Sequence, residues 1–544
     1  MKKLVYFCII LAGLVAVGQV DAQYAKPDTL IKGIGNLNHP VSTTSVEAQA
    51  FFNQGLTLVY AFNHESAYIS FETAAKLDPK LAMAYWGMAL SLGPNINTPI
   101  DLEREKKAYE LIQKALSLSN NDKVITANEK EYIQALAARY TDNPNPDYKA
   151  LDIAYNNAMY VLMQNYPEDL DAAALYAESG MDLHPWALWT GDGKSVEGTD
   201  ALIAVLESII KRDPMHIGAN HYYIHAVEGS DRPERALLSA ERLPDLVPAS
   251  GHLIHMPSHI YILVGDYHKA FVINEDAVRV DEEFVRANGV KEYILHYTSH
   301  NIYFASRAAC LEGNYARAKK YADKLSEFLK PEIIASMPDM EYYTTGSLLI
   351  DLRFNKWNKI LTEKEPPVMV KNQVPLWFFA RSVCLVKTND LSGAKKAREQ
   401  FLLEKQKARA DARFGYNKLS SILDIAEHYL NACIARAEGK INDAIDHLKM
   451  AIGLQDSLGY NEPPDWFFPI RETLGATYFL NQQYEEAAKV FKEDLNRHPR
   501  NGRSLFGLLQ TLKAQNKTTD AFWVGEEFKK AWKYADTDLK MENL

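Results

Sequence analysis

Histidines are concentrated in the middle of this chain, between His216 and His300. That stretch holds nine of the fifteen histidines in the sequence. On a helix, residues three or four positions apart lie on one face, one turn from each other. Seven of the nine recur at such spacings, in three groups: His221 and His225; His252, His255 and His259; His296 and His300. The pattern predicts helical segments that each present imidazoles on a single face.

Neutral imidazole is the most common metal-binding side chain, and several imidazoles on one face favour a transition-metal site. We predict that His221, His225, His255 and His259 bind one transition metal ion, namely zinc, copper or iron. Three protein ligands and one open position describe a catalytic metal site, in which the bound water is acidified toward neutrality. A metal-dependent reaction is therefore one use that we consider for these histidines.

Carboxylates occur at the same spacing as the histidines. Glu228 lies one turn beyond His225 and is predicted to act as a ligand or as a base. Glu178 and Asp182 are predicted to hydrogen bond to the imidazoles and to fix their tautomers. We assign candidate catalytic roles to Glu228 and Asp182.

Further residues are predicted to line the same ligand site. They are His252, His296, His300, Glu178, Trp186 and Tyr261. Two other interpretations stay open beside the metal site. In one, the histidines and tyrosines hydrogen bond to a peptide or a glycan, with Trp186 as a stacking wall. In the other, the histidines are only structural, as most single helical histidines are.

The elements that carry these residues repeat with a period of 34 residues. Near the start, small and aromatic residues mark one unit: Gly55, Ala67, Phe71, Ala74 and Pro79. Near the end, the same positions are filled by Gly475, Ala487, Phe491 and Pro499. This arrangement resembles the tetratricopeptide repeat (TPR) family, in which small residues lie where two helices touch. The resemblance implies an all-α, TPR-like α-solenoid, a superhelical stack of helix pairs.

The resemblance also implies where the histidines point. In TPR proteins the first helix of each pair lines a concave groove, mainly through positions 2, 5, 9, 12 and 13 of the repeat. The in-phase register puts His221 at position 5 and His225 at position 9 of one unit. It puts His252, His255 and His259 at positions 2, 5 and 9 of the next, and His300 at position 2 of the third. We therefore expect the imidazoles of successive units to face one groove.

Composition divides the chain into four parts. Residues 1–22 have two lysines, an apolar run and a small-residue cleavage pattern, which predicts a signal peptide. Residues 23–47 are predicted to be an extended lead-in, residues 48–330 an N-terminal TPR-like half with the histidine-rich groove, and residues 331–544 a C-terminal TPR-like half. We expect secretion across an inner membrane, and the periplasm as the destination.

Charge and cysteine content limit the possible partners. The formal net charge of −10 argues against nucleic-acid binding, which needs a basic surface. Only four cysteines occur, and Cys8 lies in the predicted signal peptide, so no disulfide framework is expected. No run after the signal peptide is long and apolar enough to predict a membrane span.

Two functions remain as hypotheses. The first is an exported protein whose histidine-rich groove binds a transition metal. The second is a non-enzymatic interaction or scaffold module that serves an envelope or nutrient-utilisation system, for example one for polysaccharide, with a protein, peptide or glycan in the groove. The phrases MAYWGMAL, MDLHPW and GHLIHMPSHIYILVGDY are similar to exported bacterial TPR proteins, a resemblance that implies no reaction.

Overall fold

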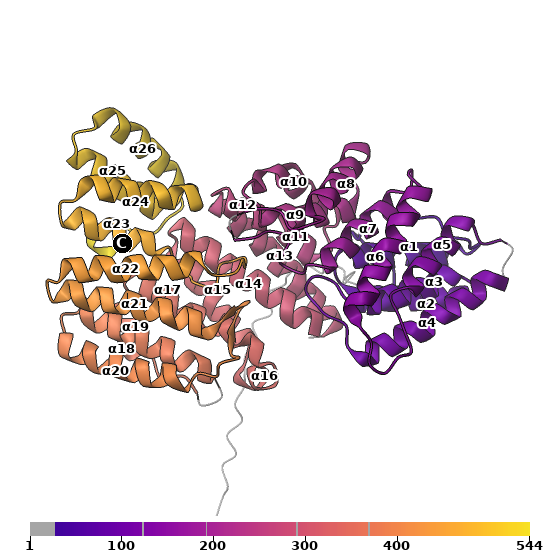
Figure 1. Ribbon diagram of the computed structural model, residues 1–544, viewed down its shortest axis with the longest axis horizontal. Coiled ribbons are helices and arrows are strands. Elements are labelled where there is room, and N and C mark those ends of the chain that lie inside the picture. Colours follow the sequence, from indigo (N-terminus) through magenta and orange to yellow (C-terminus); the bar gives the residue numbers. More distant parts are fainter. Residues whose placement is uncertain (1–27, 122–123, 192, 290–291, 368–369) are drawn as a thin grey trace, which may run out of the picture.

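The structure is a computed structural model that describes residues 28–121, 124–191, 193–289, 292–367 and 370–544. The predicted signal peptide lies outside the described residues. Residues 28–45 form turns and irregular backbone, and helices follow one another from Val46 onward (Figure 1).

The first part of the described chain holds eight helices before the histidine-bearing stretch. They are α1 (Val46–Tyr60), α2 (His64–Leu77), α3 (Ala82–Leu92), α4 (Leu102–Asn121), α5 (Ala127–Ala137), α6 (Tyr148–Asn165), α7 (Leu170–Asp182) and α8 (Thr199–Arg212). The histidine-bearing stretch and its second helices follow: α9 (Ile217–Glu228), η1 (Pro233–Ala236), α10 (Leu237–Leu246), α11 (Gly251–His255), α12 (Pro257–Leu263), α13 (Tyr267–Asn288), α14 (Glu292–Glu312) and α15 (Tyr315–Phe328).

The remaining elements form the left-hand part of Figure 1. They are α16 (Pro331–Ser336), η2 (Pro338–Thr345), α17 (Gly346–Arg353), α18 (Trp357–Thr362), η3 (Lys371–Gln373), α19 (Val374–Lys387), α20 (Leu391–Lys407), β1 (Arg413–Phe414), β2 (Asn417–Lys418), α21 (Leu419–Ala437), α22 (Ile441–Asp456), α23 (Ile470–Leu480), α24 (Tyr484–Arg497), α25 (Gly502–Ala514), α26 (Thr518–Ala531) and η4 (Met541–Asn543). Strands β1 and β2 pair antiparallel as a short hairpin.

Neighbouring helices pack as antiparallel pairs, and a phenylalanine between glycines holds the pairs close. The ring of Phe71 on α2 lies so close to α1 that a Cβ at Gly55 would come within 2.7 Å of it. Phe491 on α24 does the same to Gly475 on α23, again at 2.7 Å. The same device at both ends of the chain confirms the predicted all-α, TPR-like solenoid.

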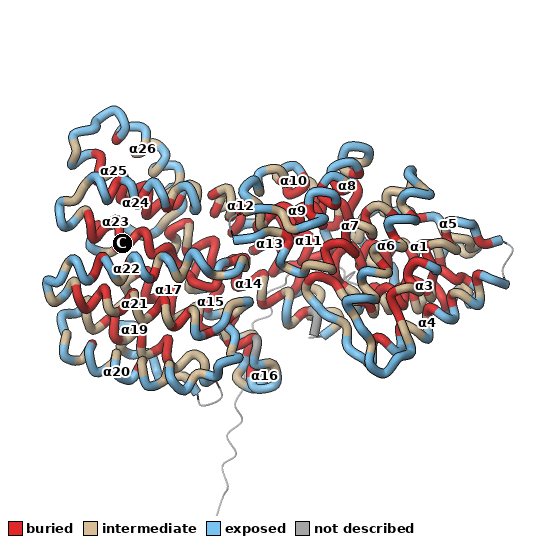
Figure 2. Tube along the Cα trace, viewed as in Figure 1, coloured by how far each residue is buried: buried red, intermediate tan, exposed pale blue. Residues whose placement is uncertain are grey.

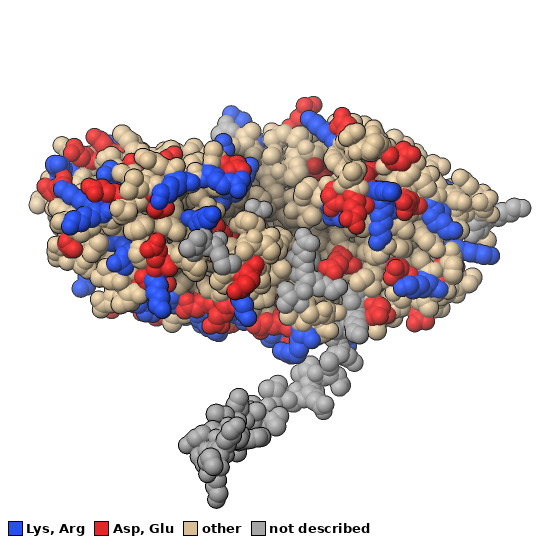
Figure 3. Space-filling view, turned by 90° about the horizontal axis from the view of Figure 1, so that it is seen from below, with Lys and Arg blue, Asp and Glu red and all other residues tan. Residues whose placement is uncertain are grey.

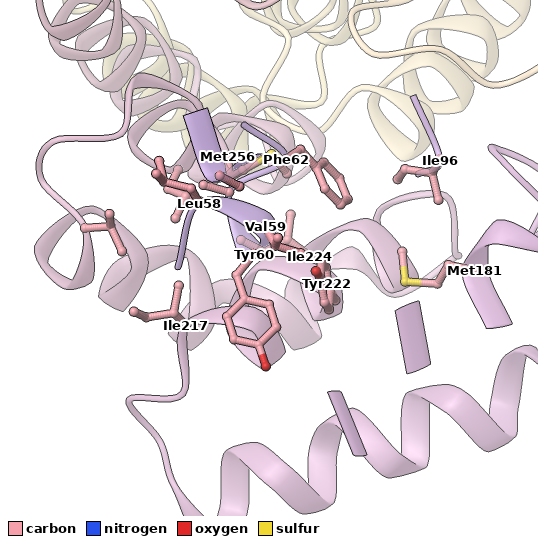
Figure 4. Close-up of a cluster of buried hydrophobic side chains, with 14 of the residues drawn as sticks. Leu58, Val59, Tyr60, Phe62, Ile96, Met181, Ile217, Tyr222, Ile224 and Met256 are labelled. Atoms are coloured by element: carbon pink, nitrogen blue, oxygen red, sulfur yellow. The ribbon is translucent and has the colours of Figure 1, made fainter. Parts of the chain in front are cut away.

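The buried apolar residues form two large cores. One extends from Ala48 to Val370 and the other from Leu349 to Leu544, and buried segments run through both ends of the molecule (Figure 2). Figure 4 shows part of the first core, where Tyr60 of α1 lies beside Tyr222 and Ile224 of α9. Every residue of α9 is buried, so this helix lies inside the stack.

The C-terminal helices fold back against the middle of the chain. The hydroxyl of Tyr267 donates to the carbonyl of Pro499 at 2.9 Å, and the backbone of Tyr315 donates to Asp536 at 2.7 Å. The superhelix therefore brings residues more than two hundred positions apart into contact beside the histidine-bearing helices.

The surface carries both signs of charge. On the face shown in Figure 3, basic and acidic side chains are interspersed. Among the described residues, no helix is both long and apolar enough to cross a membrane.

Candidate metal centre

Three consecutive repeat units present six histidines to one interior. Helix α9 carries two of them, the interrupted helix α11–α12 carries three, and α14 carries one: His221, His225, His252, His255, His259 and His300. The interruption falls at Pro257, which begins α12 and has no N–H to continue the ladder of α11. These helices were predicted to converge, and the structure brings their imidazoles together.

The six rings form two groups of three, so the four histidines that were predicted to bind one ion are divided between two groups. In the first triad, His221, His225 and His252 each offer one ring nitrogen within 4.8 Å of the others. The Nε2 atoms of His221 and His252 are 3.1 Å apart.

The second triad consists of His255, His259 and His300, and it meets the same 4.8 Å limit. The Nε2 atoms of His255 and His259 are 2.8 Å apart. The ring of His300 lies 4.7 Å from that of His255, centroid to centroid. His225 of the first triad and His259 of the second are only 5.7 Å apart by the same measure, so the triads are neighbours.

Glu228, at the end of α9, contacts one histidine of each triad. Its Oε1 accepts from Nδ1 of His225 at 2.7 Å, and its Oε2 accepts from Nδ1 of His259. A carboxylate that accepts from Nδ1 leaves Nε2 as the ring nitrogen that carries the lone pair. Glu228 therefore orients both rings so that their Nε2 atoms are free to bind a cation.

Two other histidines are held in the same way. Nδ1 of His221 donates to the backbone carbonyl of Tyr60 at 2.6 Å. Nδ1 of His255 donates to Oδ1 of Asn274 at 2.6 Å, and the amide of Asn274 donates to Ala270, which fixes its orientation. In each of the four histidines that were predicted as metal ligands, Nδ1 therefore carries the proton and donates it to a protein acceptor.

Burial favours the neutral form of His221, His252, His255 and His300. His221 and His255 are 0% exposed and His259 is 1% exposed. Burial, followed by the neighbouring histidines, lowers the pKa of His221, His252 and His255 well below the usual value. Burial and His259 lower the pKa of His300 to about 3. Neutral imidazole is the form that binds metal.

The charge of Glu228 is stabilised by the rings it orients. Burial alone would raise its pKa, but His259 and His225 outweigh that effect, and the pKa of Glu228 falls below its ordinary value. Glu228 therefore stays a carboxylate and supplies a negative charge beside both triads.

Aromatic rings surround the first triad. Phe62 packs edge-on against His221 with ring centroids 4.6 Å apart, and it stacks on His252 at 5.8 Å. Tyr297 of α14 packs on the other side of His252 at 4.6 Å, and the amide of Asn97 donates to its hydroxyl. The predicted groove is thus a closed, aromatic-walled interior at this point.

The C-terminal half completes the site, which the sequence did not indicate. The hydroxyl of Tyr460, in the loop after α22, donates to Oε2 of Glu228 at 3.2 Å. Tyr416, in the turn of the β1–β2 hairpin, lies 5.3 Å from Trp186, whose ring packs edge-on against His225 at 5.6 Å. Trp186 therefore lines the site as predicted, and Tyr460 and Tyr416 join it from more than two hundred residues away.

Glu178 and Asp182 lie elsewhere, contrary to the prediction that they orient the imidazoles. Asp182 accepts from Arg139 at 2.7 Å. Burial and the neighbouring Asp182 raise the pKa of Glu178 well above its usual value. Arg139, which follows α5, takes up the face of α7 that the repeat register assigned to the groove. The prediction of a catalytic role for Asp182 is not supported by any contact with a histidine of the triads.

Two other predicted residues are also outside the cluster. Tyr261 lies two residues beyond His259 and so points to a different face of α12, where the ammonium of Lys269 lies 5.3 Å from its ring centre. His296, near the start of α14, is exposed and lies one turn before His300.

A third group of possible ligands surrounds Asp171 on α7. Its Oδ2 interacts with Nδ1 of His39 at 2.7 Å, and its Oδ1 accepts from Tyr60 at 2.5 Å. Asp169 in the same group caps α7 and accepts from Tyr132 at 3.0 Å. These carboxylates already have protein partners, so the group is a structural hydrogen-bond network.

Sequence comparison identifies no relatives: no protein family and no curated protein matches this chain. Among solved structures, human IFIT1 with PPP-AAAA aligns over 90% of this chain and 92% of that chain, at 12% identity and a TM-score of 0.30. The Cut9–Hcn1 hetero-tetramer of the APC/C aligns over 87% of this chain and 77% of that chain, at 13% identity and a TM-score of 0.33. At such scores, the fold assignment rests on the helix pairs described above.

Proposed function

We propose that this helical-repeat protein binds transition metal ions in its interior, one in each histidine triad. The observation that carries the proposal is the pair His255 and His259. Both Nδ1 atoms donate to protein acceptors, and the two Nε2 atoms face each other at 2.8 Å. Two lone pairs in this position repel each other unless a cation lies between them.

The spacing suits a metal after a small adjustment. Nitrogens that bind one zinc ion tetrahedrally at ~2.0–2.1 Å are roughly 3.3 Å apart. The Nε2 pairs at 2.8 Å and 3.1 Å need only a few tenths of an ångström of ring movement to reach this separation. The neutral rings, the oriented Nδ1 protons and the carboxylate of Glu228 are the features that hold metal ligands in place.

Three histidines leave one coordination position open. A water in that position is acidified by the metal, and a donor atom of a substrate can replace it. Two neighbouring ions would act on one ligand together.

The test is the metal content of the purified protein after dialysis. We expect two equivalents of transition metal, one for each triad. His225→Ala should remove the ion of the first triad and His259→Ala that of the second. His428→Ala is the matched control, since His428 on α21 pairs with His447 on α22 at 3.1 Å, and neither helix carries a histidine of the triads. A folded protein that retains no metal, or loses none in the two triad variants, contradicts the proposal.

A second function, as a scaffold for protein partners, is supported by two neighbouring aromatic side chains on α26. Helix α26 exposes Phe522 and Trp523, at 57% and 64%. We propose that a protein partner covers them. A partner that copurifies with the wild type should be lost with Trp523→Ala, and equal recovery contradicts this role.

We also propose that the protein is exported, on the strength of the signal sequence in residues 1–22. N-terminal sequencing of the mature protein should then begin at Gln23. A mature protein that still begins at Met1 contradicts export by a cleaved signal.

A further inference from the structure

Arg307 is a buried cation without an ion-pair partner among the described residues. It lies on α14, is 4% exposed, and its Nε has no hydrogen-bond partner. Its guanidinium lies 5.7 Å from the ring centre of Phe467, in the loop after α22. A buried guanidinium normally pairs with a carboxylate, since an unpaired buried charge is costly.

Glu462 is the nearby acid, but it does not pair with Arg307. It is 4% exposed, and its Oε1 has no hydrogen-bond partner. Burial and the charge of Glu228 raise its pKa well above the usual value, although Arg307 opposes this. Among the described residues, Glu462 thus forms no ion pair with Arg307, and no other carboxylate does either.

Helix α14 connects Arg307 to the histidines. His300 and Arg307 are seven residues apart, which puts them on one face, two turns or about 10 Å apart along the helix. Between them, Tyr303 on α14 packs against Tyr343 of η2 at 5.3 Å. Tyr303 thus lies on the same face of α14 as His300 and Arg307, three positions after the first and four before the second.

We propose that Arg307 anchors a ligand by its carboxylate group. The planar fork of arginine matches a carboxylate with two parallel hydrogen bonds. The other end of the ligand reaches the triads, a part of the proposal that rests on the proposed metal function. An extended chain of about three residues spans such a distance, so the carboxylate belongs either to a small organic acid or to the C-terminus of a peptide.

The experiment measures binding by calorimetry with three probes. They are propionate, N-acetyl-trialanine with a free C-terminal carboxylate, and the same peptide with a C-terminal amide. Each probe is titrated into metal-free and zinc-loaded protein. The variant Arg307→Lys keeps the charge and loses the fork. Arg317→Lys is the matched control, because Arg317 also lies over a phenylalanine ring, at 4.8 Å, but is paired with Glu312.

We expect the carboxylate peptide to bind at least about ten-fold more tightly than the amide, and Arg307→Lys to lose most of that difference. Arg317→Lys should retain it. Preference for the peptide acid over propionate identifies a peptide terminus, and the reverse identifies a small acid. Equal binding of acid and amide, no binding of any probe, or an unchanged Arg307→Lys protein overturns the carboxylate site. Discrimination in the metal-free protein together with no zinc uptake would refute the metal function alone.

Discussion

Replacing Glu228 tests whether this carboxylate orients one imidazole ring in each triad, namely that of His225 and that of His259. Its two oxygens accept from His225 at 2.7 Å and from His259. Loss of one such partner typically weakens metal binding about 10–100-fold, or ~1.4–2.7 kcal/mol. Glu228→Gln keeps one acceptor oxygen and turns an amide N–H₂ toward the other ring, so we expect a loss of about 10–100-fold. Glu228→Ala removes both partners, and independent effects would multiply to ~10²–10⁴-fold.

The assay is competition for zinc between the protein and a fluorescent chelator, with folding checked by circular dichroism. Glu178→Gln is the matched control, since the carboxyl group of Glu178 is also buried but hydrogen bonds to Asp182 and to no imidazole of the triads. Its zinc affinity should equal that of the wild type. Wild-type affinity in Glu228→Gln, or an equal loss in Glu178→Gln, would refute the assignment of Glu228 as the residue that orients both rings.

Three further variants test the surroundings of the site and the fold. Gly55→Ala should destabilise the protein by about 1–3 kcal/mol, because the new Cβ would lie 2.7 Å from the ring of Phe71. Gly453 lies in a helix with open space where a Cβ would lie, so Gly453→Ala should be neutral or stabilising. Equal denaturation midpoints for the two variants would contradict this prediction. Asp281→Asn should stabilise the protein by up to a few kcal/mol at pH 8 and by less at pH 5. Burial raises the pKa of Asp281 to about 7, so the wild type loses stability as the pH rises from about 4 to 7. A difference in thermal unfolding that does not change with pH would count against this prediction. Tyr460→Phe should weaken zinc binding by less than about ten-fold in the chelator assay, because it removes only one hydrogen bond to the carboxylate of Glu228. An effect as large as that of Glu228→Ala would be inconsistent with this prediction.

The repeat architecture could be predicted because its determinants are local. Gly55 and Phe71, and again Gly475 and Phe491, recur at the spacing at which a ring fills the space between two helices. The groove-facing register of His221, with that of the other clustered histidines, follows from the same phase. Convergence of the imidazoles was therefore readable from the sequence.

The partners of the histidines could not be predicted, because they depend on contacts between distant units. Arg139, from an earlier unit, draws Asp182 away from the site that its register suggested. Tyr460 reaches Glu228 across 232 positions, because the superhelix returns the C-terminal half to the middle of the chain. A 34-residue period specifies neighbouring pairs but does not specify which distant loops meet.

The most direct test of the central claim is an anomalous difference map at the zinc absorption edge, from crystals of the zinc-loaded protein. We predict two peaks, one in each triad, at ~2.0–2.1 Å from the ligand nitrogens. One peak lies among His221, His225 and His252, and the other lies among His255, His259 and His300. A map without a peak at either triad, with Nε2 of His255 and His259 still in contact at 2.8 Å through a shared proton, would contradict it.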